Sequence, residues 1–129
     1  MIITDDVCSG FTGADIFRLG ALGVPCTMDN NKRLHMHHKF AIIDGKILVT
    51  GSFNWSSQAV TGNQENLIVI DNEYLCKEYK KQFDKMWTKF EANQLKQDEC
   101  IKKVEEDEEM ERKKKEAKKG EKKKKISWY

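Results

Sequence analysis

The chain has 129 residues, 39% of them hydrophobic and 34% charged, which leaves room for one domain with a modest core that does not span the whole length. It contains no run of about 18 apolar residues that would cross a membrane, and its start lacks the basic and apolar regions of a signal peptide. The four cysteines form no CxxC pair, which argues against a zinc ribbon or a dithiol redox motif. We expect them to be reduced thiols in a cytosol-facing compartment.

The first part of the chain alternates strand and helix patterns. Residues 1–4 predict a strand, and residues 12–22 predict a helix whose apolar stripe ends before a stop signal at Gly23. Residues 24–28 predict a second short strand, which is followed by a turn over residues 29–32.

A hairpin signal follows at Asp44–Gly45, where two predicted strands, residues 36–44 and 46–52, meet. Residues 66–70 form another apolar run. Residues 72–92 predict a helix with one face packed on the core. The residues of that face are Tyr79, Phe83, Met86, Trp87 and Phe90. Strands alternating with helices indicate an α/β domain.

Charge is distributed unevenly along the chain, although the net charge is only +2. Residues 112–125 contain ten Lys or Arg and two Glu, whereas residues 105–111 contain six acids. We therefore divide the chain into a domain over residues 1–92, an acidic polar linker or helix extension over residues 93–111, and a lysine-rich tail over residues 112–129. Blocks of like charge are usually solvated, so the tail is expected to be disordered, with polyanion binding as the other interpretation.

Four polar side chains are brought together by the predicted hairpin. His37 and Lys39 lie on one face of the first strand, because side chains two residues apart share a face. Ser52 and Asn54 share a face by the same rule. One imidazole, one ammonium, one hydroxyl and one amide in a small space suit a phosphate. Lys39 would supply the charge, and Ser52 and Asn54 would supply neutral donors.

An imidazole can attack phosphorus directly and form a phosphohistidine intermediate, provided that the attacking nitrogen is unprotonated and the other ring nitrogen is held. His37 is the candidate nucleophile. Glu65, just before the next strand, is the candidate carboxylate that holds its ring. Asp44 either supports this site or begins the turn, and the two roles are compatible.

A metal site built on His35, His37 and His38 is disfavoured. Adjacent residues of a strand face opposite sides, so His38 does not join His37 on one ion, and no carboxylate or thiol is spaced to complete a ligand set. Cys8 and Cys26 are predicted to be small buried residues rather than ligands. The sequence therefore predicts neither a metal site nor a cofactor.

The spacing HxKx4D from His37 to Asp44, followed after six residues by GSxN, resembles the motif of the phospholipase D superfamily. The wider run MHHKFAIIDGKILVTGSFNW, with NQEN downstream, is most similar to the mitochondrial phospholipase D branch, which includes mitochondrial cardiolipin hydrolases and Zucchini-type nucleases. The resemblance covers about residues 1–92, and fixed residues at fixed spacing make it specific.

The resemblance implies a layered phospholipase D-type fold, in which helices flank a mixed sheet, and metal-independent hydrolysis of a phosphodiester. It implies that His37 is the nucleophile and that Lys39 and Asn54 bind the phosphate. It also implies that Asp44 supports the site and that Glu65 corresponds to a downstream glutamate of the family. The implied substrate is an anionic phospholipid such as cardiolipin, or single-stranded RNA.

Members of this branch carry a membrane anchor, further strands and a zinc-binding segment of cysteines and histidine before the position of Met1. The chain is therefore expected to be a catalytic half, truncated at its amino terminus. By resemblance, its place is the cytosolic face of the mitochondrial outer membrane.

Hydrolysis of a phosphodiester needs two proton-handling groups, but the chain has one HxK motif. We therefore expect a homodimer with a shared active site. The rival hypothesis is a non-catalytic fragment. Such a fragment would bind nucleic acid or an anionic membrane through its basic tail.

Overall fold

The computed structural model describes residues 1–10 and 14–126 of the chain. The elements, in chain order, are β1 (Ile2–Thr4), the 3-10 helix η1 (Cys8–Gly10), α1 (Ile16–Ala21), β2 (Cys26–Met28), β3 (Phe40–Ile43), β4 (Ile47–Gly51), α2 (Ser57–Thr61), β5 (Leu67–Asp71), α3 (Glu73–Phe90), the 3-10 helix η2 (Glu91–Asn93) and α4 (Gln97–Ile126). The predicted alternation of strands and helices is confirmed. The first residues of the helix predicted over residues 12–22 lie outside the described residues.

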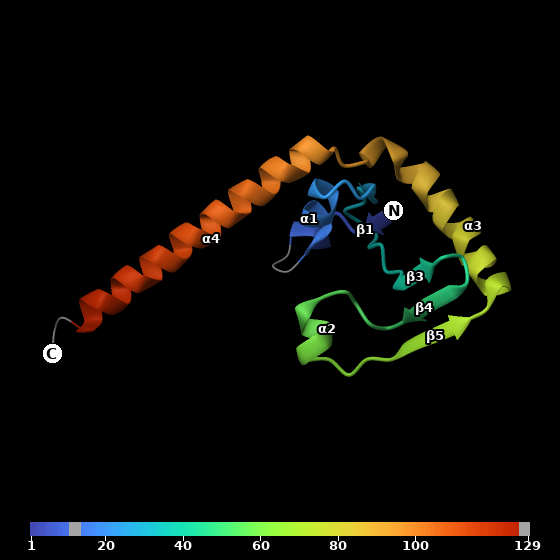
Figure 1. Cartoon of the computed structure of the whole chain (residues 1–129), viewed down its shortest axis with the longest axis horizontal. Coiled ribbons are helices and arrows are strands. Elements are labelled where there is room, and N and C mark those ends of the chain that lie inside the picture. Colours follow the sequence, from blue (N-terminus) through green and yellow to red (C-terminus); the bar gives the residue numbers. More distant parts are fainter. Residues whose placement is uncertain (11–13, 127–129) are drawn as a thin grey trace.

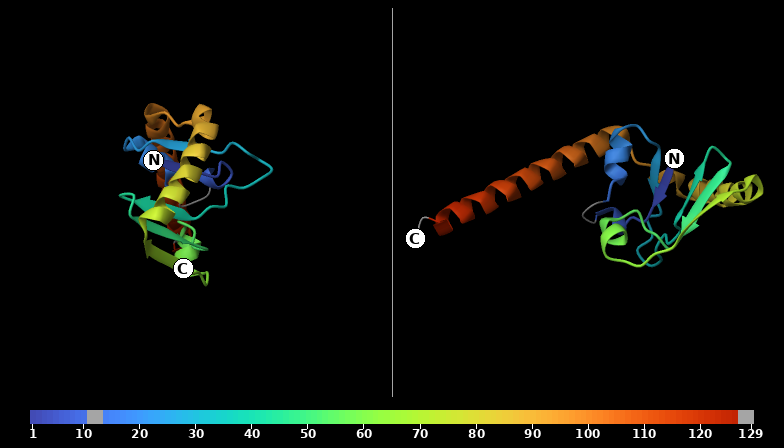
Figure 2. Two further views of the ribbon diagram at one scale, coloured as in Figure 1. Left: turned by 90° about the vertical axis from the view of Figure 1, so that its right-hand side faces the viewer. Right: turned by 60° about the horizontal axis from the view of Figure 1, so that its bottom comes forward.

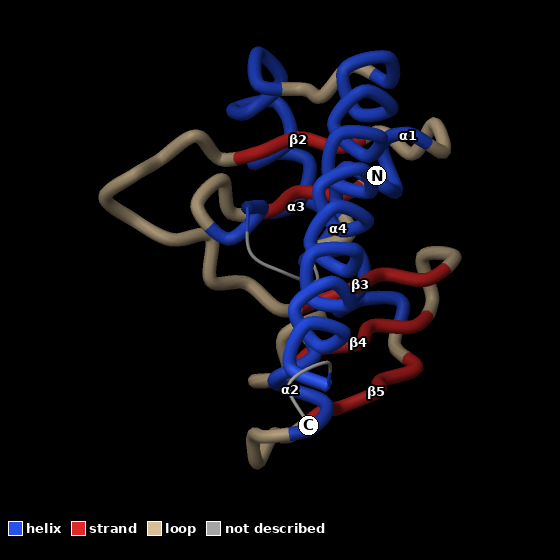
Figure 3. The backbone as a smooth tube through the Cα atoms, turned by 90° about the vertical axis from the view of Figure 1, so that its left-hand side faces the viewer, coloured by secondary structure: helices blue, strands red, loops and turns tan. Residues whose placement is uncertain are grey.

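The strands form two small sheets (Figure 3). β1 pairs with β2 in parallel, and β3, β4 and β5 form an antiparallel sheet in that order. Helix α3 runs along the three-stranded sheet and leads back towards α1 and β2 (Figure 1). Parallel and antiparallel pairs flanked by helices make the α/β class that the sequence predicts.

The hairpin between β3 and β4 turns at the predicted place. Asp44 and Gly45 have φ angles of 52° and 68°, and the Lys46 amide donates to the Ile43 carbonyl over 3.0 Å. Two consecutive residues with positive φ match the twist of an antiparallel pair, and Asp and Gly are among the residues that adopt them readily. The predicted strand over residues 36–44 is too long, however, because β3 begins only at Phe40.

The core lies between α1, β2 and the first turns of α4, with a second part under α3. Its most buried side chains are Cys26, Thr27, Leu48, Cys76 and Cys100. The predicted apolar face of α3 packs as expected. Phe83 stacks on Trp87 with ring centroids 6.0 Å apart, Tyr79 meets Phe40 edge-on at 5.1 Å, and Met86 and Phe90 are buried.

Helix α4 begins against α1 and then runs away from the rest of the molecule (Figures 1 and 2). The helices approach closely at Gly20, where an added Cβ would lie 2.6 Å from the Cys100 sulfur. Beyond this contact the helix is charged on every side. None of the helices in the described part of the chain is long and apolar enough to span a membrane.

The expectation of a disordered tail is wrong for residues 112–126, because α4 continues to Ile126 without a break at residue 112; the last three residues of the predicted tail lie outside the described residues. The acidic block directly precedes the basic block, so carboxylates and ammonium groups four residues apart can pair across the boundary between them. The Lys113 ammonium lies 2.7 Å from Glu109, and that of Lys115 lies 3.5 Å from Glu111. Such exposed pairs each contribute about 0.3–0.5 kcal/mol to a helix.

Candidate active site

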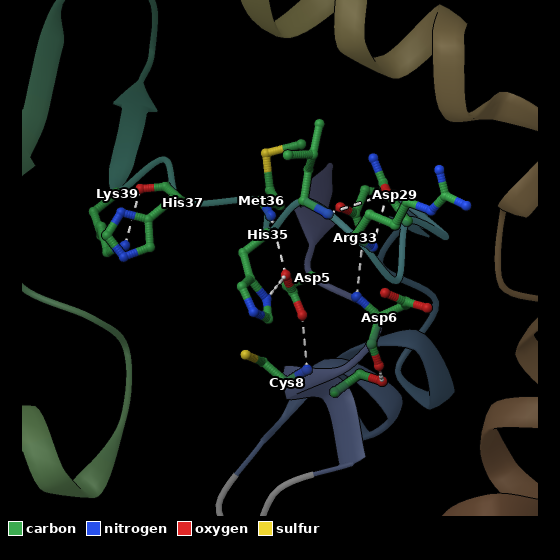
Figure 4. Close-up of polar contacts among 12 residues, drawn as sticks. Asp5, Asp6, Cys8, Asp29, Arg33, His35, Met36, His37 and Lys39 are labelled. Carbon is green, nitrogen blue, oxygen red and sulfur yellow. Dashed lines mark hydrogen bonds and ion pairs between the residues drawn. The ribbon is translucent and has the colours of Figure 1, made fainter.

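His37 and Lys39 lie in the segment that leads into β3. The Lys39 ammonium turns back and donates to the His37 carbonyl oxygen over 2.9 Å (Figure 4). The Lys39 carbonyl accepts from the Thr50 hydroxyl over 3.1 Å, which ties this segment to β4. His37 is exposed and Lys39 is half-buried. The imidazole is therefore open to solvent beside a cation that is held in place.

A buried carboxylate at the end of β1 positions this segment. Asp5 is 5% exposed, and its Oδ2 accepts from the Met36 amide over 3.0 Å and lies 2.8 Å from His35 Nδ1. Its Oδ1 accepts from the Cys8 amide over 2.8 Å (Figure 4). The Met36 amide therefore bonds a side chain rather than a strand, and β3 begins only at Phe40.

Hydrogen bonding controls the charge of Asp5. Although burial by itself raises the pKa of this carboxyl group, the hydrogen bonds from Cys8, His35 and Met36 together lower the pKa below its usual value. The group is therefore an anion at neutral pH. Two of its partners, His35 and Met36, lie about 30 residues away in the chain, so no motif spacing in the sequence points to Asp5.

The second side of the site lies where β4 meets the start of β5. The Ser52 hydroxyl donates to Glu65 Oε2 over 2.5 Å and accepts from the Asn66 amide over 3.1 Å. Asn63 donates to the other Glu65 oxygen over 2.8 Å. Gly51 is required here, because its φ is 154° and any Cβ would collide with the Asn66 carbonyl.

Electrostatics connect the two sides. The hydrogen bond from Ser52 and then that from Asn63 lower the pKa of Glu65, with a further contribution from the charge of Lys39. Burial lowers the pKa of the Lys39 ammonium below its usual value, while Cys8 and Glu65 act in the opposite direction. Lys39 and Glu65 therefore lie within electrostatic range of each other, and the site combines an imidazole, an ammonium and a hydroxyl-bound carboxylate.

Two predicted site residues lie outside this cluster. Asp44 sits in the hairpin turn, roughly 16 Å along the strand from Lys39 at about 3.3 Å per residue. Asn54 is exposed and lies in the loop between Ser52 and α2, where its backbone carbonyl accepts a hydrogen bond from the Ser56 amide. Turn formation is thus the role that the geometry supports for Asp44.

Glu65 hydrogen-bonds Ser52 and Asn63, and among the described residues no hydrogen bond links it to His37. Its role as the holder of the imidazole stays a prediction.

The cysteines divide into two kinds. Cys26, Cys76 and Cys100 are buried and Cys8 is exposed, so the expectation of burial is confirmed for Cys26 and wrong for Cys8. Cys8 lies in η1, which the bond to Asp5 holds at the surface. Asp5, Cys8 and His35 offer a carboxylate, a thiol and an imidazole within 4.8 Å of one another.

Known relatives match the chain over the region that holds this site. A family model described as "Cardiolipin synthase, PLD-like domain" matches residues 1–87. The mitochondrial cardiolipin hydrolase of Chlamydomonas reinhardtii is 45% identical over 89 residues, which are 69% of this chain and 40% of that protein. The protein of the same name from Xenopus laevis is 37% identical over 90 residues, 70% of this chain and 42% of that protein. The chain thus spans about two fifths of the length of these relatives.

A solved structure has a similar fold. The crystal structure of a phospholipase D family member, Nuc from Salmonella typhimurium, aligns with a TM-score of 0.66 and 25% sequence identity, covering 73% of this chain and 62% of that one. The family match extends over two thirds of the chain and includes His37, Lys39, Ser52 and Glu65. The chain therefore belongs to the PLD-like domain family of the phospholipase D superfamily, in the branch of the mitochondrial cardiolipin hydrolases.

Proposed function

We propose that this chain is the catalytic part of a phosphodiester hydrolase that uses His37 as its nucleophile. The observation that carries the proposal is the exposed imidazole of His37 beside the positioned ammonium of Lys39, with the Ser52–Glu65 pair in electrostatic range. A nucleophile next to a fixed cation suits attack on an anionic phosphorus centre. Membership of the phospholipase D superfamily points to the same reaction.

The reaction proceeds in two displacements. A neutral ring nitrogen of His37 attacks phosphorus, a P–N bond forms, and the P–O bond to the leaving alcohol breaks as that oxygen takes up a proton. Water then attacks the phosphohistidine, gives up a proton and releases the imidazole. Lys39 neutralises the charge of the phosphoryl oxygens, and we assign the exposed amide of Asn54, outside the cluster, a supporting role as a neutral donor that orients them once substrate is bound. Lys39 supplies the positive charge that a metal ion would otherwise provide, so the chemistry is metal-independent.

The substrate we favour is an anionic phospholipid of the cardiolipin type, because the relatives with 45% and 37% identity are named mitochondrial cardiolipin hydrolase. Their name also supports a mitochondrial location, for which we propose the cytosolic face of the outer membrane. Single-stranded RNA presents the same diester and is the alternative substrate. Parallel assays on cardiolipin vesicles and on a fluorescent oligonucleotide, each with wild type and His37→Asn, separate the two.

We further propose that the active unit is a homodimer in which two copies of His37 share one phosphate. One imidazole would attack and the other would protonate the leaving oxygen. Apolar side chains at the sheet edge support an interface, because Leu67, Ile68 and Val69 of β5 are each at least 50% exposed and β5 starts beside Ser52. Mixing His37→Asn with wild-type chains should lower activity faster than the wild-type fraction falls. A linear fall would contradict the shared site.

The rival function is binding without catalysis, through the basic end of α4. The ten basic residues between positions 112 and 125 favour it, since they would attract a nucleic acid or an anionic membrane in a salt-dependent way. Deletion of residues 112–129 tests this function. A variant that loses vesicle binding but keeps turnover at saturating substrate supports the enzyme with an accessory tail. A wild-type chain that binds both polyanions and hydrolyses neither supports the rival.

A further inference from the structure

Three side chains of kinds that bind metal ions meet next to the candidate active site. The proposed reaction does not use any of the three chemically. Asp5 comes from the end of β1, Cys8 from η1, and His35 from the loop before β3. Their donor atoms lie within 4.8 Å of one another, and Figure 4 shows them facing one another. The sequence hid this group, because its carboxylate and thiol precede His35 by 30 and 27 residues.

The three donors differ in how firmly they are held. Asp5 is buried and fixed by two backbone amides, those of Cys8 and Met36. The His35 side chain is 61% exposed and Cys8 is exposed, so both can adjust and an ion can reach them from solvent. Asp5 is therefore a fixed ligand and Cys8 and His35 are accessible ones, as in a metal site that is only partly preorganised.

The chemistry of the donor set selects the kind of ion. Thiolate sulfur and imidazole nitrogen bind zinc-class ions strongly, whereas magnesium and calcium prefer sets made only of oxygen. A tetrahedral ion with bonds of about 2.0–2.3 Å to these donors requires donor atoms about 3.3–3.8 Å apart, so small side-chain adjustments suffice. Three protein ligands leave a fourth position for water.

We propose that Asp5, Cys8 and His35 form a binding site for a divalent zinc-class ion. On binding, the Cys8 thiol releases its proton to solvent and its sulfur bonds to the ion. The neutral His35 ring carries its proton on Nε2, so that Nδ1, which faces Asp5, gives up its hydrogen bond and becomes a ligand. The carboxylate and thiolate together balance the two positive charges of the ion.

The position of this site suggests what the ion does. It would join η1 to the loop that leads into His37 and Lys39, and so brace the loop that carries the nucleophile. This role is separate from the phosphodiester chemistry, in which Lys39 supplies the charge. An ion here is thus compatible with a metal-independent reaction.

Metal binding by the whole chain tests the proposal. Untagged protein freed of metal with a chelator is titrated with Zn²⁺ by calorimetry, and with Co²⁺ by absorbance, where thiolate ligation gives a sulfur-to-cobalt charge-transfer band. We expect one ion per chain and a clear charge-transfer band. Cys8→Ser should abolish the band, and both Cys8→Ser and His35→Asn should weaken Zn²⁺ binding by at least roughly 10-fold.

The matched control is His38→Asn, which removes an exposed histidine outside the group and should leave both titrations unchanged. Circular dichroism verifies that each variant is folded, which is expected because both exchanged side chains are exposed. Thermal unfolding adds a second readout, since Zn²⁺ should raise the midpoint of the wild type but not that of Cys8→Ser. Absence of the charge-transfer band in the wild type, or equal Zn²⁺ affinities of wild type and Cys8→Ser, would overturn the proposal.

Discussion

The two sides of the candidate site are built in different ways. The His37 side is irregular backbone, held by hydrogen bonds to one buried carboxylate about 30 residues away. The Ser52 side grows out of paired strands, with Ser52 and Asn66 exchanging hydrogen bonds next to the last rung of the β4–β5 ladder. The first side therefore depends on a few side-chain hydrogen bonds, from Asp5 and from Thr50, whereas the second depends on strand register, which many residues share.

The largest effect is expected from the nucleophile on the first side. His37→Asn keeps a polar side chain of similar shape but cannot form the phosphohistidine, so turnover should fall by about 10³-fold or more. Stability should not change, because the His37 side chain is exposed. Steady-state assays and urea unfolding measure the two effects. His38→Asn is the control and should retain activity, and full activity in His37→Asn would refute the covalent mechanism.

The difference in construction is tested most directly by removing one carboxylate from each side. Asp5→Asn should lower the free energy of unfolding by about 1–3 kcal/mol, because buried amides lose a charged acceptor, and turnover should fall with it. Glu65→Gln should lower turnover and leave stability nearly unchanged. Urea unfolding at pH 7 measures the stability loss of each variant. Equal stability losses would mean that the two sides are held alike.

The pH dependence of stability tests the role of Asp5 separately. The folded-state pKa of Asp5 lies below its unfolded value, so its contribution to stability is complete above about pH 4 and is lost as the pH falls through the folded pKa. Wild type should therefore lose more stability than Asp5→Asn between pH 6 and pH 3. Parallel acid curves for the two proteins would show that Asp5 is not the group responsible.

The same contrast explains which parts could be predicted from sequence. The hairpin at Asp44–Gly45, the apolar face of α3 and the motif residues follow from local patterns of turn chemistry and periodicity. The start of β3 could not be predicted, because it depends on the long-range tether to Asp5. A motif therefore identified His37 and Lys39, while the carboxylate that positions them had no signal of its own.

Helices were missed for other reasons. α2 is only five residues long, and its start depends on a Ser56 side chain that accepts from the Ala59 amide. The tail was expected to be disordered because its composition is so charged, yet charge order along α4 pairs acids with lysines one turn apart. Composition alone does not record that order.

A further prediction concerns Lys39, which links the two sides. Burial lowers the pKa of its ammonium, so this charge should be lost at a lower pH than for an exposed lysine. The alkaline limb of kcat/KM for the wild type should therefore lie below the usual titration range of lysine. Lys39→Arg, which stays charged, should show lower activity but no such limb. An unchanged limb in that variant would assign the titration to another group.

The smallest effect is expected at Asp44, the motif residue that lies away from both sides. Its φ of 52° lies in the left-handed region, which Asn adopts readily and β-branched residues resist at a cost of about 1–2 kcal/mol. Asp44→Asn should therefore leave both turnover and stability close to wild type. Asp44→Val should lower the free energy of unfolding by about that amount while turnover at saturating substrate stays close to normal. If Asp44→Asn instead lowers turnover 10-fold or more without loss of stability, the carboxylate itself supports catalysis and the turn role is insufficient.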